Sequence, residues 1–205
     1  RSIWVTGVQT CALPILTEEE WDEVVRVHLK GTFAPTHFAA AYWRDRAAGG
    51  HPVDARVINT TSRAGLFGSV GQANYASAKA GIASLTSVAA LELAKYGVTV
   101  NAISPGALTR MTAPLGMDKA AAKAAAEGFD FTDPANVAPV VVWLGSPASK
   151  GVTGKVIEIF GGRLKLYQGW SEAATVDKKA RWEVAEVGEA LRSLMARTSG
   201  SLPPG

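Results

Sequence analysis

The sequence predicts an α/β protein built on a doubly wound parallel sheet whose first half is missing. Three buried-strand patterns, over 55–61, 98–103 and 155–160, alternate with helical patterns along the chain. Strands that alternate with helices indicate right-handed crossover units and a parallel sheet. Three strands make a thin sheet for such a fold, so we expect the chain to hold only its second half.

Residues 1–15 do not fit this fold. A β-branched run into Thr-Gly could be a first strand, but a pyrophosphate-binding turn needs further glycines. None follows Gly7 closely, and Pro14 stands where a helix should run. The stretch VTGVQTCALPI can be encoded by a DNA string that resembles a common sequencing adapter. We therefore interpret 1–15 as a non-native segment, with a genuine strand and loop as the alternative.

The first helix is expected to begin at Thr17. Thr17 and Glu20 have the capping-box spacing, and apolar residues then recur at helical intervals. Pro35 has no N–H group and is expected to kink this helix, whose pattern resumes over 38–43. The helix therefore crosses from the N-terminal segment to the strand at 55–61.

The second half of the domain follows in clear order. A Gly- and Ser-rich loop leads to a long helix, about 74–96, which Gly97 closes as a C-terminal cap. The strand at 98–103 ends at Ser104-Pro105-Gly106, and 107–131 is expected to be a loop with a short Ala-rich helix. Asp133-Pro134 opens a helix to about Leu144.

The domain division follows from these elements. Residues 16–163 are expected to form the C-terminal part of a Rossmann-like domain, and 164–205 a helical extension. A helix is expected over about 184–197, and the polar end after it is expected to fray.

Composition limits the classes of function. Hydrophobic residues make up 47% of the 205 residues, charged residues 19%, and the net charge is +3. This balance is typical of a globular protein, and no basic run indicates a nucleic-acid partner. No apolar stretch approaches the roughly 20 residues of a membrane helix. Cys11 is the single cysteine, so we expect no disulfide and no thiolate metal site, which is compatible with a cytoplasmic location.

The stretch NTTSRAGLFGSVGQANYASAKAG, 59–81, carries the candidate chemistry. Tyr75 follows Ser62 by 13 residues, and Lys79 follows Tyr75 by four. A spacing of four places two side chains on one face of a helix. Ser62 ends a strand, and the carboxyl ends of parallel strands face the ligand crevice. We therefore expect a hydroxyl, a phenol and an ammonium to meet there.

These three groups suit reduction of a carbonyl. The reaction needs a proton donor at the oxygen while hydride reaches the carbon. A tyrosine has an ordinary pKa of about 10, and a nearby ammonium is expected to lower the pKa of Tyr75. Tyr75 is then the general acid for reduction and the general base for oxidation. Ser62 holds the oxygen, and Lys79 adjusts Tyr75 and contacts the ribose of a nicotinamide cofactor.

The motifs resemble the short-chain dehydrogenase/reductase family. The resemblance rests on Ser62, the Tyr75-x-x-x-Lys79 pattern, the Gly-rich loop between them and the later VNAISPG, and it covers about 17–162. It implies an NAD(P)-dependent oxidoreductase, with NAD or NADP as cofactor. It also implies that Pro105, Gly106 and Thr109 line the nicotinamide pocket.

Two departures from the family pattern stand out. The chain has VHLKG where the family has VNLKG, so the resemblance assigns His28 to a proton relay that uses a backbone carbonyl at a helix kink. A side-chain shuttle or a packed histidine are the alternatives. The glycine turn and the strand that would separate NAD from NADP are also absent. We therefore expect an incomplete cofactor site.

The resemblance also bears on partners and substrate. It implies a homo-oligomer, a dimer or a tetramer, and a small-molecule hydroxyl/carbonyl substrate, 3-hydroxyacyl/3-oxoacyl-like or steroid-like. Arg63, directly after Ser62, could meet an acidic group of the substrate or simply be solvated. Two other functions stay open: a non-catalytic binding or scaffold module of this fold, and an epimerase or dehydratase that uses the same Tyr75 and Lys79.

Overall fold

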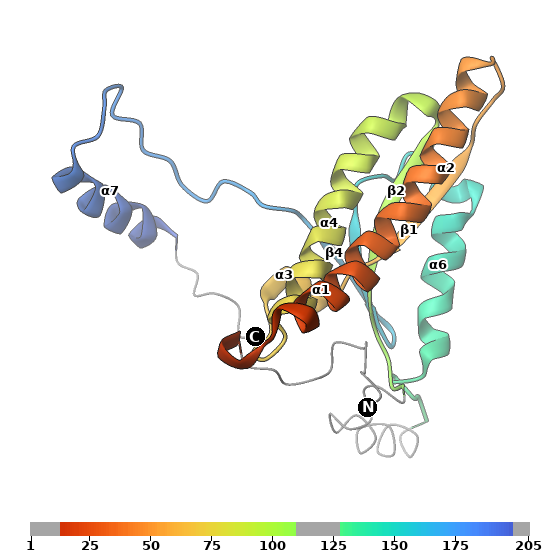
Figure 1. Ribbon diagram of the computed structural model, residues 1–205, viewed down its shortest axis with the longest axis horizontal. Helices are drawn as coiled ribbons and strands as arrows, with labels where there is room; N and C mark the ends of the chain where they lie inside the picture. Colours follow the sequence, from red (N-terminus) through yellow and green to blue (C-terminus); the bar gives the residue numbers. More distant parts are fainter. Residues whose placement is uncertain (1–12, 110–127, 199–205) are drawn as a thin grey trace. The chain divides into compact units, whose positions relative to one another are not determined.

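A computed structural model describes residues 13–109 and 128–198 of the chain (Figure 1). The chain divides into two compact units, Arg1–Tyr167 and Gln168–Gly205. Most of the expected non-native segment and the Ala-rich helix at 119–127 lie outside the described residues. The predictions for these parts therefore stay predictions.

The first unit contains a four-stranded sheet in the order β1-β2-β3-β4. β1 (Ala55–Thr60), β2 (Val98–Gly106) and β3 (Val156–Phe160) run parallel, and β4 (Arg163–Tyr167) pairs antiparallel with β3. The three parallel strands confirm the predicted sheet. β2 is longer than expected, because the Ser-Pro-Gly stretch at its end still pairs with β3.

Helices cover both faces of the sheet, as a doubly wound fold requires (Figure 1). α2 and α4 lie side by side over one face, with α1 at the start of this layer, and α6 lies on the opposite face. The longer helices of this unit are α1 (Glu18–Val25), α2 (Gly31–Ala48), α3 (Arg63–Phe67), α4 (Ala73–Leu93) and α6 (Ala138–Gly145). Short helical turns are η1 (Leu13–Ile15), η2 (Arg26–Lys30), η3 (Ala94–Tyr96), η5 (Pro134–Val137) and η6 (Pro147–Ser149).

The core lies between α4 and the sheet. Ala90 and Leu93 of α4 pack with Val98 and Val100 of β2, and all four are buried. Trp43 of α2 packs against the same cluster. Fully burying a valine or leucine side chain contributes about 1.5–3 kcal/mol. This packing fixes α4 over β2 and so fixes the helix that carries Tyr75.

Three helix caps are confirmed. Thr17 and Glu20 form a complete capping box at the start of α1. Asp133 accepts a hydrogen bond from the Ala135 N–H at the start of η5. Gly97 ends η3 with φ +80°, a left-handed conformation that glycine adopts without steric cost. These caps are local signals, so sequence patterns find them well.

The first helix continues through Pro35 as predicted, and it contains one irregular turn that was not predicted. α2 runs unbroken through Pro35, and the irregular turn lies earlier, in the π-helix η2. The Gly31 N–H bonds the Arg26 carbonyl five residues back, which is the π pattern. The extra residue in this turn, not the proline itself, marks the irregularity in the helix.

Two elements were not predicted. α3 lies within the expected Gly-rich loop, and β4 lies where the helical extension was expected to begin. β4 alternates polar and apolar residues, but its apolar Leu164 and Leu166 are 61% and 63% exposed while Lys165 turns toward Glu158. The first compact unit ends at Tyr167, the last residue of β4.

β1 has an open edge in the described part of the chain. Ala55 and Thr61 donate their N–H groups to Gly97 and Ile103 on the β2 side. Backbone groups of alternate residues in a parallel strand point to opposite edges. Arg56, Ile58 and Thr60 therefore turn their backbone groups to the other side, where no described strand pairs with them.

The second unit holds one regular helix in its described residues, α7 (Val184–Arg197). Its bounds match the prediction, and Glu183 and Glu186 form its capping box. Among the described residues, no helix combines the length and the apolar character needed to cross a bilayer. The same residues contain no group of three or more His, Cys, Asp or Glu arranged to hold a metal ion.

We predict that Gly97→Ala destabilises the protein by about 1–2 kcal/mol, the cost of a left-handed non-glycine residue, or by more. The added Cβ would lie 2.3 Å from the Val53 carbonyl oxygen. Gly145→Ala is the control, because its Cβ meets no atom closer than 4.0 Å and helical alanine is favoured over glycine. The denaturation midpoints of the two variants are measured in chemical denaturant. Equal midpoints for the two variants would contradict the assigned cap.

Candidate active site

Ser62 lies directly beyond the carboxyl end of β1 and forms the N-cap of α3. Its backbone is extended, and its Oγ accepts a hydrogen bond of 3.2 Å from the Ala64 N–H. With one lone pair engaged in this way, the hydroxyl hydrogen is available to donate. The Ser62 hydroxyl lies near enough to the Tyr75 phenol to act on its pKa, which it lowers. The predicted meeting of these two side chains is thus present in the structure.

Tyr75 and Lys79 lie one turn apart on α4. The Lys79 Nζ lies 5.6 Å from the centre of the Tyr75 ring. Asn74 helps to begin the helix here, since its side-chain oxygen accepts from the Tyr75 N–H at 2.8 Å and its amide donates to the Glu20 carbonyl at 3.2 Å. The three predicted side chains therefore share one location.

Close packing of α3 on α4 holds this arrangement. A Cβ on Gly65 would lie 2.6 Å from the backbone of Lys79 and Ala80, so only glycine allows this approach. The buried Thr61 hydroxyl also donates to the Lys79 carbonyl at 2.7 Å. The end of β1 and the first turns of α4 are thereby fixed to each other.

The pKa of Tyr75 shifts in the direction opposite to the prediction. Burial raises this pKa because the phenolate would lose hydration, and the Ser62 hydrogen bond lowers it by less. The sequence argument assigned the dominant effect to the Lys79 ammonium. In the structure that ammonium is directed to a backbone carbonyl, so Tyr75 is a protonated phenol at neutral pH.

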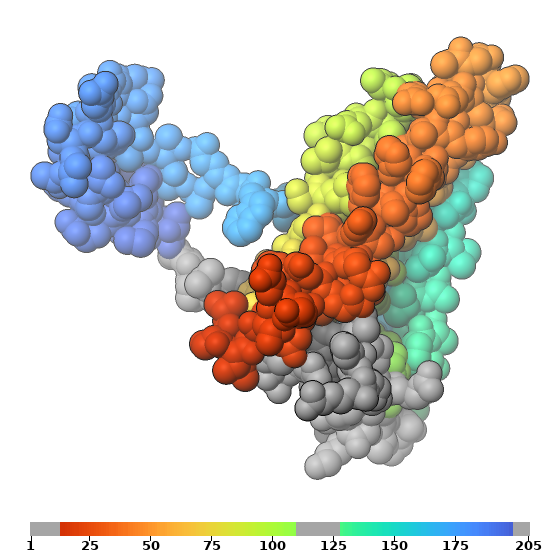
Figure 2. All heavy atoms as spheres, in the orientation of Figure 1, coloured from red at the N-terminus to blue at the C-terminus, as the bar shows by residue number. Residues whose placement is uncertain are grey.

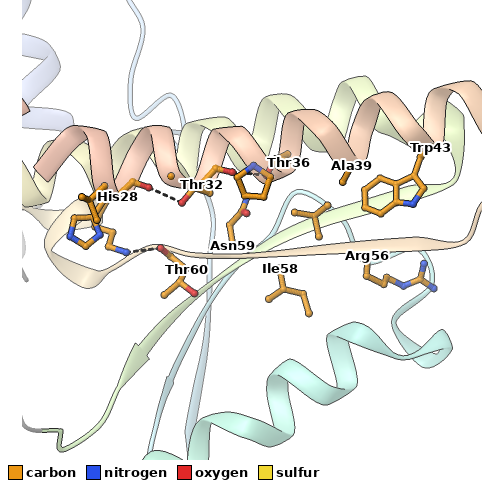
Figure 3. Close-up of a pocket in the computed structure, with 14 residues that line it drawn as sticks. His28, Thr32, Thr36, Ala39, Trp43, Arg56, Ile58, Asn59 and Thr60 are labelled. Atoms are coloured by element: carbon orange, nitrogen blue, oxygen red, sulfur yellow. Dashed lines mark hydrogen bonds between the residues drawn. The ribbon is translucent and has the colours of Figure 1, made fainter. Parts of the chain in front are cut away.

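Lys79 is buried and donates from Nζ to the Thr60 carbonyl at 2.9 Å. Burial lowers the pKa of Lys79, because the ammonium loses hydration. Figure 3 shows this hydrogen bond at one end of a cavity of about 530 Å³ between α2 and β1. The Thr60 carbonyl faces the open edge of β1, so the lysine lies where that edge meets the cavity.

His28 lies against Tyr75 at the irregular turn η2. The two rings meet edge to face, with centres 5.1 Å apart. The Thr32 hydroxyl donates to the His28 carbonyl at 2.8 Å, as Figure 3 shows. The carbonyl assigned to the relay therefore lies at an irregular helical turn, and the imidazole borders the same cavity.

The predicted cofactor residues Pro105 and Gly106 lie at the end of β2, opposite Ile159 and Phe160 of β3. They border a second cavity together with Arg63, the residue after Ser62. Thr109 is exposed in the segment that follows β2. The sheet thus brings the two strand ends that carry Ser62 and Pro105 to the same edge.

Several contacts at the site were missed by the sequence reasoning. The Thr60 carbonyl is a backbone group, so no residue type indicates its bond to Lys79. Thr32 gave a faint signal, because a threonine four residues after a helical residue often bonds its carbonyl. Glu158, buried on β3 beside Arg63 and Lys165, lies in a segment that was predicted as a strand without any role for its carboxylate.

A family model described as Enoyl-(Acyl carrier protein) reductase matches residues 8–163. This match spans more than half of the chain and includes all the site residues described above. The chain belongs to the short-chain dehydrogenase/reductase family. The Ser62, Tyr75 and Lys79 pattern and the parallel sheet agree with this assignment.

Curated relatives support the same family. Hydroxyacyl-CoA dehydrogenase ChsB1 of Mycobacterium tuberculosis is 48% identical over 153 residues, which is 74% of this chain and 48% of that protein. The 3-oxoacyl-[acyl-carrier-protein] reductase FabG of Thermotoga maritima is 38% identical over 161 residues, 76% of this chain and 62% of that protein. The chain thus spans about half to three fifths of the length of these relatives.

A solved structure shows the same fold. The crystal structure of a short chain dehydrogenase from Mycobacterium avium matches with a TM-score of 0.82 and 48% identity, covering 94% of this chain and 63% of that one. Full-length peroxisomal multifunctional enzyme type 2 from Drosophila melanogaster matches with a TM-score of 0.67 and 25% identity, covering 93% of this chain and 32% of that one. The fold of this chain therefore also occurs as part of longer proteins.

We predict that Ser62→Ala raises the pKa of Tyr75 further, because the variant loses the hydrogen bond that lowers it. The tyrosinate absorbance of the chain is followed against pH, and the same titration of Tyr75→Phe identifies the contribution of Tyr75. An unchanged or lower Tyr75 pKa in Ser62→Ala would show that the two hydroxyls do not interact.

Proposed function

We propose that the chain carries the catalytic half of an NAD(P)-dependent oxidoreductase that interconverts a secondary alcohol and a ketone. The observation that carries the proposal is the convergence of Ser62, Tyr75 and Lys79 at the carboxyl end of β1. Family membership and relatives named as hydroxyacyl-CoA dehydrogenases and a 3-oxoacyl-ACP reductase support it.

Each side chain has a role in this proposal. Ser62 donates a hydrogen bond to the substrate oxygen and holds it near the phenol. Tyr75, a protonated phenol at neutral pH, gives its proton to that oxygen during reduction and recovers it during oxidation. Because burial raises the pKa of Tyr75, oxidation requires a further group that stabilises the phenolate.

Lys79 supplies that stabilisation when its ammonium turns toward Tyr75. The lysine already lies 5.6 Å from the ring, and its present partner is a single backbone carbonyl. His28, in edge contact with Tyr75, completes a relay through its backbone carbonyl and the Thr32 hydroxyl. These residues therefore position and replenish the proton of Tyr75.

The chain's residues fit the nicotinamide end of the cofactor, NAD or NADP. A bound nicotinamide supplies the hydride in reduction and accepts it in oxidation. Lys79 presents a buried ammonium beside the first cavity, which suits ribose hydroxyls. Pro105 and Gly106 border the second cavity, and with Thr109 they are proposed to hold the nicotinamide. The adenosine end requires a glycine turn, which we propose lies in a preceding half of the domain that pairs with the open edge of β1.

The substrate is proposed to be 3-hydroxyacyl/3-oxoacyl-like, with a steroid-like substrate as the alternative. The relatives named for hydroxyacyl-CoA and 3-oxoacyl-ACP chemistry favour the first. A cytoplasmic location is also proposed, and the lack of any cysteine in residues 16–205 is compatible with it.

A homo-oligomer is also proposed. Exposed apolar side chains lie on α2 and α4, two helices that contact each other and form one face in Figure 2. Phe38 and Tyr42 of α2 are 72% and 58% exposed, and Leu91 of α4 is 82% exposed. A second copy of the chain would cover these side chains.

We predict that Tyr75→Phe lowers kcat by a factor on the order of 10²–10⁴ while the cofactor Kd stays within about twofold, because only the proton donor is lost. The assay follows reduced nicotinamide absorbance with a 3-oxoacyl thioester and uses the longest natural form of the polypeptide. Tyr96→Phe, in η3 beside Lys95, is the matched control and should keep full activity. Retained turnover in Tyr75→Phe would remove Tyr75 from its role.

We predict that Phe38→Glu and Leu91→Glu each reduce the mass measured by light scattering toward that of one chain, because a buried unpaired carboxylate opposes association. Val142→Glu is the control, at a residue of α6 that is 70% exposed on the other face of the sheet. A monomeric wild-type chain, or no effect of either variant on an oligomer, would contradict this interface.

A further inference from the structure

A second cavity, of about 440 Å³, lies at the carboxyl ends of β2 and β3. The 104–106 stretch forms one wall, and the rings of Phe131 and Phe160 form another, with their centres 5.4 Å apart. Gly106 allows the Phe160 ring to approach, because a Cβ there would lie 2.6 Å from it. The body of this cavity is therefore largely apolar and lies at the edge of the sheet where parallel α/β folds bind ligands.

Among the described residues, three cations and one carboxylate line the same cavity. The carboxylate is Glu158, which is buried on β3. Lys165 of β4 contacts it at 2.8 Å and Arg63 lies 3.8 Å from it, while the Tyr167 hydroxyl donates to it. Burial acts to raise the pKa of Glu158, but the hydrogen bonds from Lys165 and Tyr167 outweigh it, so the pKa is lowered and the carboxylate stays ionised.

One carboxylate leaves an excess of positive charge. The third cation, Arg163, begins β4, is exposed, and forms no ion pair with any described carboxylate. The Arg63 side chain is 53% exposed despite its long contact with Glu158. The described lining residues thus give the rim a net charge of +2, from Arg63, Arg163 and Lys165 against Glu158.

The position of Arg63 is set by its neighbours. Its guanidinium lies 5.2 Å from the centre of the Phe67 ring, and Phe67 in turn meets Tyr167 edge to face at 5.3 Å. These contacts hold the guanidinium between α3 and the edge of the sheet. Because Arg63 follows Ser62 directly, the charged rim lies on the α3 side of the proposed reaction site.

We propose that this cavity binds the anionic group of an amphiphilic substrate, with Arg163 and Arg63 pairing a phosphate or a carboxylate and the phenyl rings holding the adjoining apolar part. The proposal rests on the proposed function, because it names the substrate class of that same site. An arginine fork matches either anion with two parallel hydrogen bonds. The phosphate could belong to the carrier arm of a thioester, and the carboxylate to the substrate itself.

The test measures binding to the chain without any nicotinamide cofactor, by isothermal titration calorimetry. The probes are coenzyme A, pantetheine, which lacks the phosphates, hexanedioate and hexanoate. If coenzyme A binds at least tenfold more tightly than pantetheine, the anion is a phosphate. Binding of either carboxylate, with no such preference for coenzyme A, assigns it to a carboxylate.

Charge reversal locates the bound anion. Arg163→Glu is expected to raise the Kd of the probe that binds at least tenfold, and Arg63→Glu is expected to do the same. Lys150→Glu makes the same charge change at an exposed residue outside the cavity and should bind like the wild type. Circular dichroism checks that each variant is folded, and Arg163 is the decisive residue because it supports no described ion pair.

Two results would overturn the proposal. In the first, Arg163→Glu binds the probe as tightly as Lys150→Glu does. In the second, pantetheine binds the chain as tightly as coenzyme A does, and neither carboxylate binds. A failed oxidoreductase assay is a separate result, because the binding measurement needs neither cofactor nor turnover. Where the titrations assign the anion to a phosphate, Arg163→Glu in an active enzyme should raise KM for an acyl-CoA substrate by a larger factor than it lowers kcat. The same variant should leave KM for the N-acetylcysteamine thioester of that acyl group unaltered.

Discussion

The close approach of α3 to α4 at Gly65 is the contact on which the candidate site depends. Ser62 precedes this contact on one side, and Tyr75 and Lys79 belong to the helix on the other. A side chain at residue 65 would occupy the space of the Lys79 backbone, 2.6 Å away. The serine and the phenol are within hydrogen-bonding reach because the two short backbone segments can touch.

The sheet and the C-terminal part of α4 hold this contact in place. β1 and β2 pair in parallel, so that both strand ends reach the same edge of the sheet. The Thr61 hydroxyl fixes the end of β1 to the Lys79 carbonyl, and the buried Ala90 and Leu93 anchor the far end of α4 on β2. The site is therefore positioned by packed elements on three sides and not by a free loop.

The elements with local signals could be predicted from the sequence. Helix ends are indicated by residue types that are typical of caps, here Thr17, Gly97 and Asp133. The structure places all three caps as expected. The spacing of Tyr75 and Lys79 likewise fixes their common face. What depends on distant parts of the chain could not be predicted in this way. The strand β4 is the clearest case, since its leucines face solvent and its lysine faces the buried Glu158.

The pKa values of the site likewise could not be predicted from local sequence patterns. A lysine four residues after a tyrosine suggests a lowered phenol pKa, yet the outcome depends on burial and on which acceptor the ammonium finds. Here burial raises the pKa of Tyr75 and the Thr60 carbonyl holds Lys79. A strand paired at the open edge of β1 would compete for that carbonyl. The state of the lysine therefore depends on which acceptor its ammonium meets at this edge.

The Tyr75 pKa of Gly65→Ala tests the central claim most directly. Forced apart by the added Cβ, α3 and α4 should separate the Ser62 hydroxyl from the phenol, so that tyrosinate absorbance gives a Tyr75 pKa above that of the unsubstituted chain. A folded Gly65→Ala chain with an unchanged Tyr75 pKa would contradict the account, because the serine and the phenol would then meet without the close helix contact.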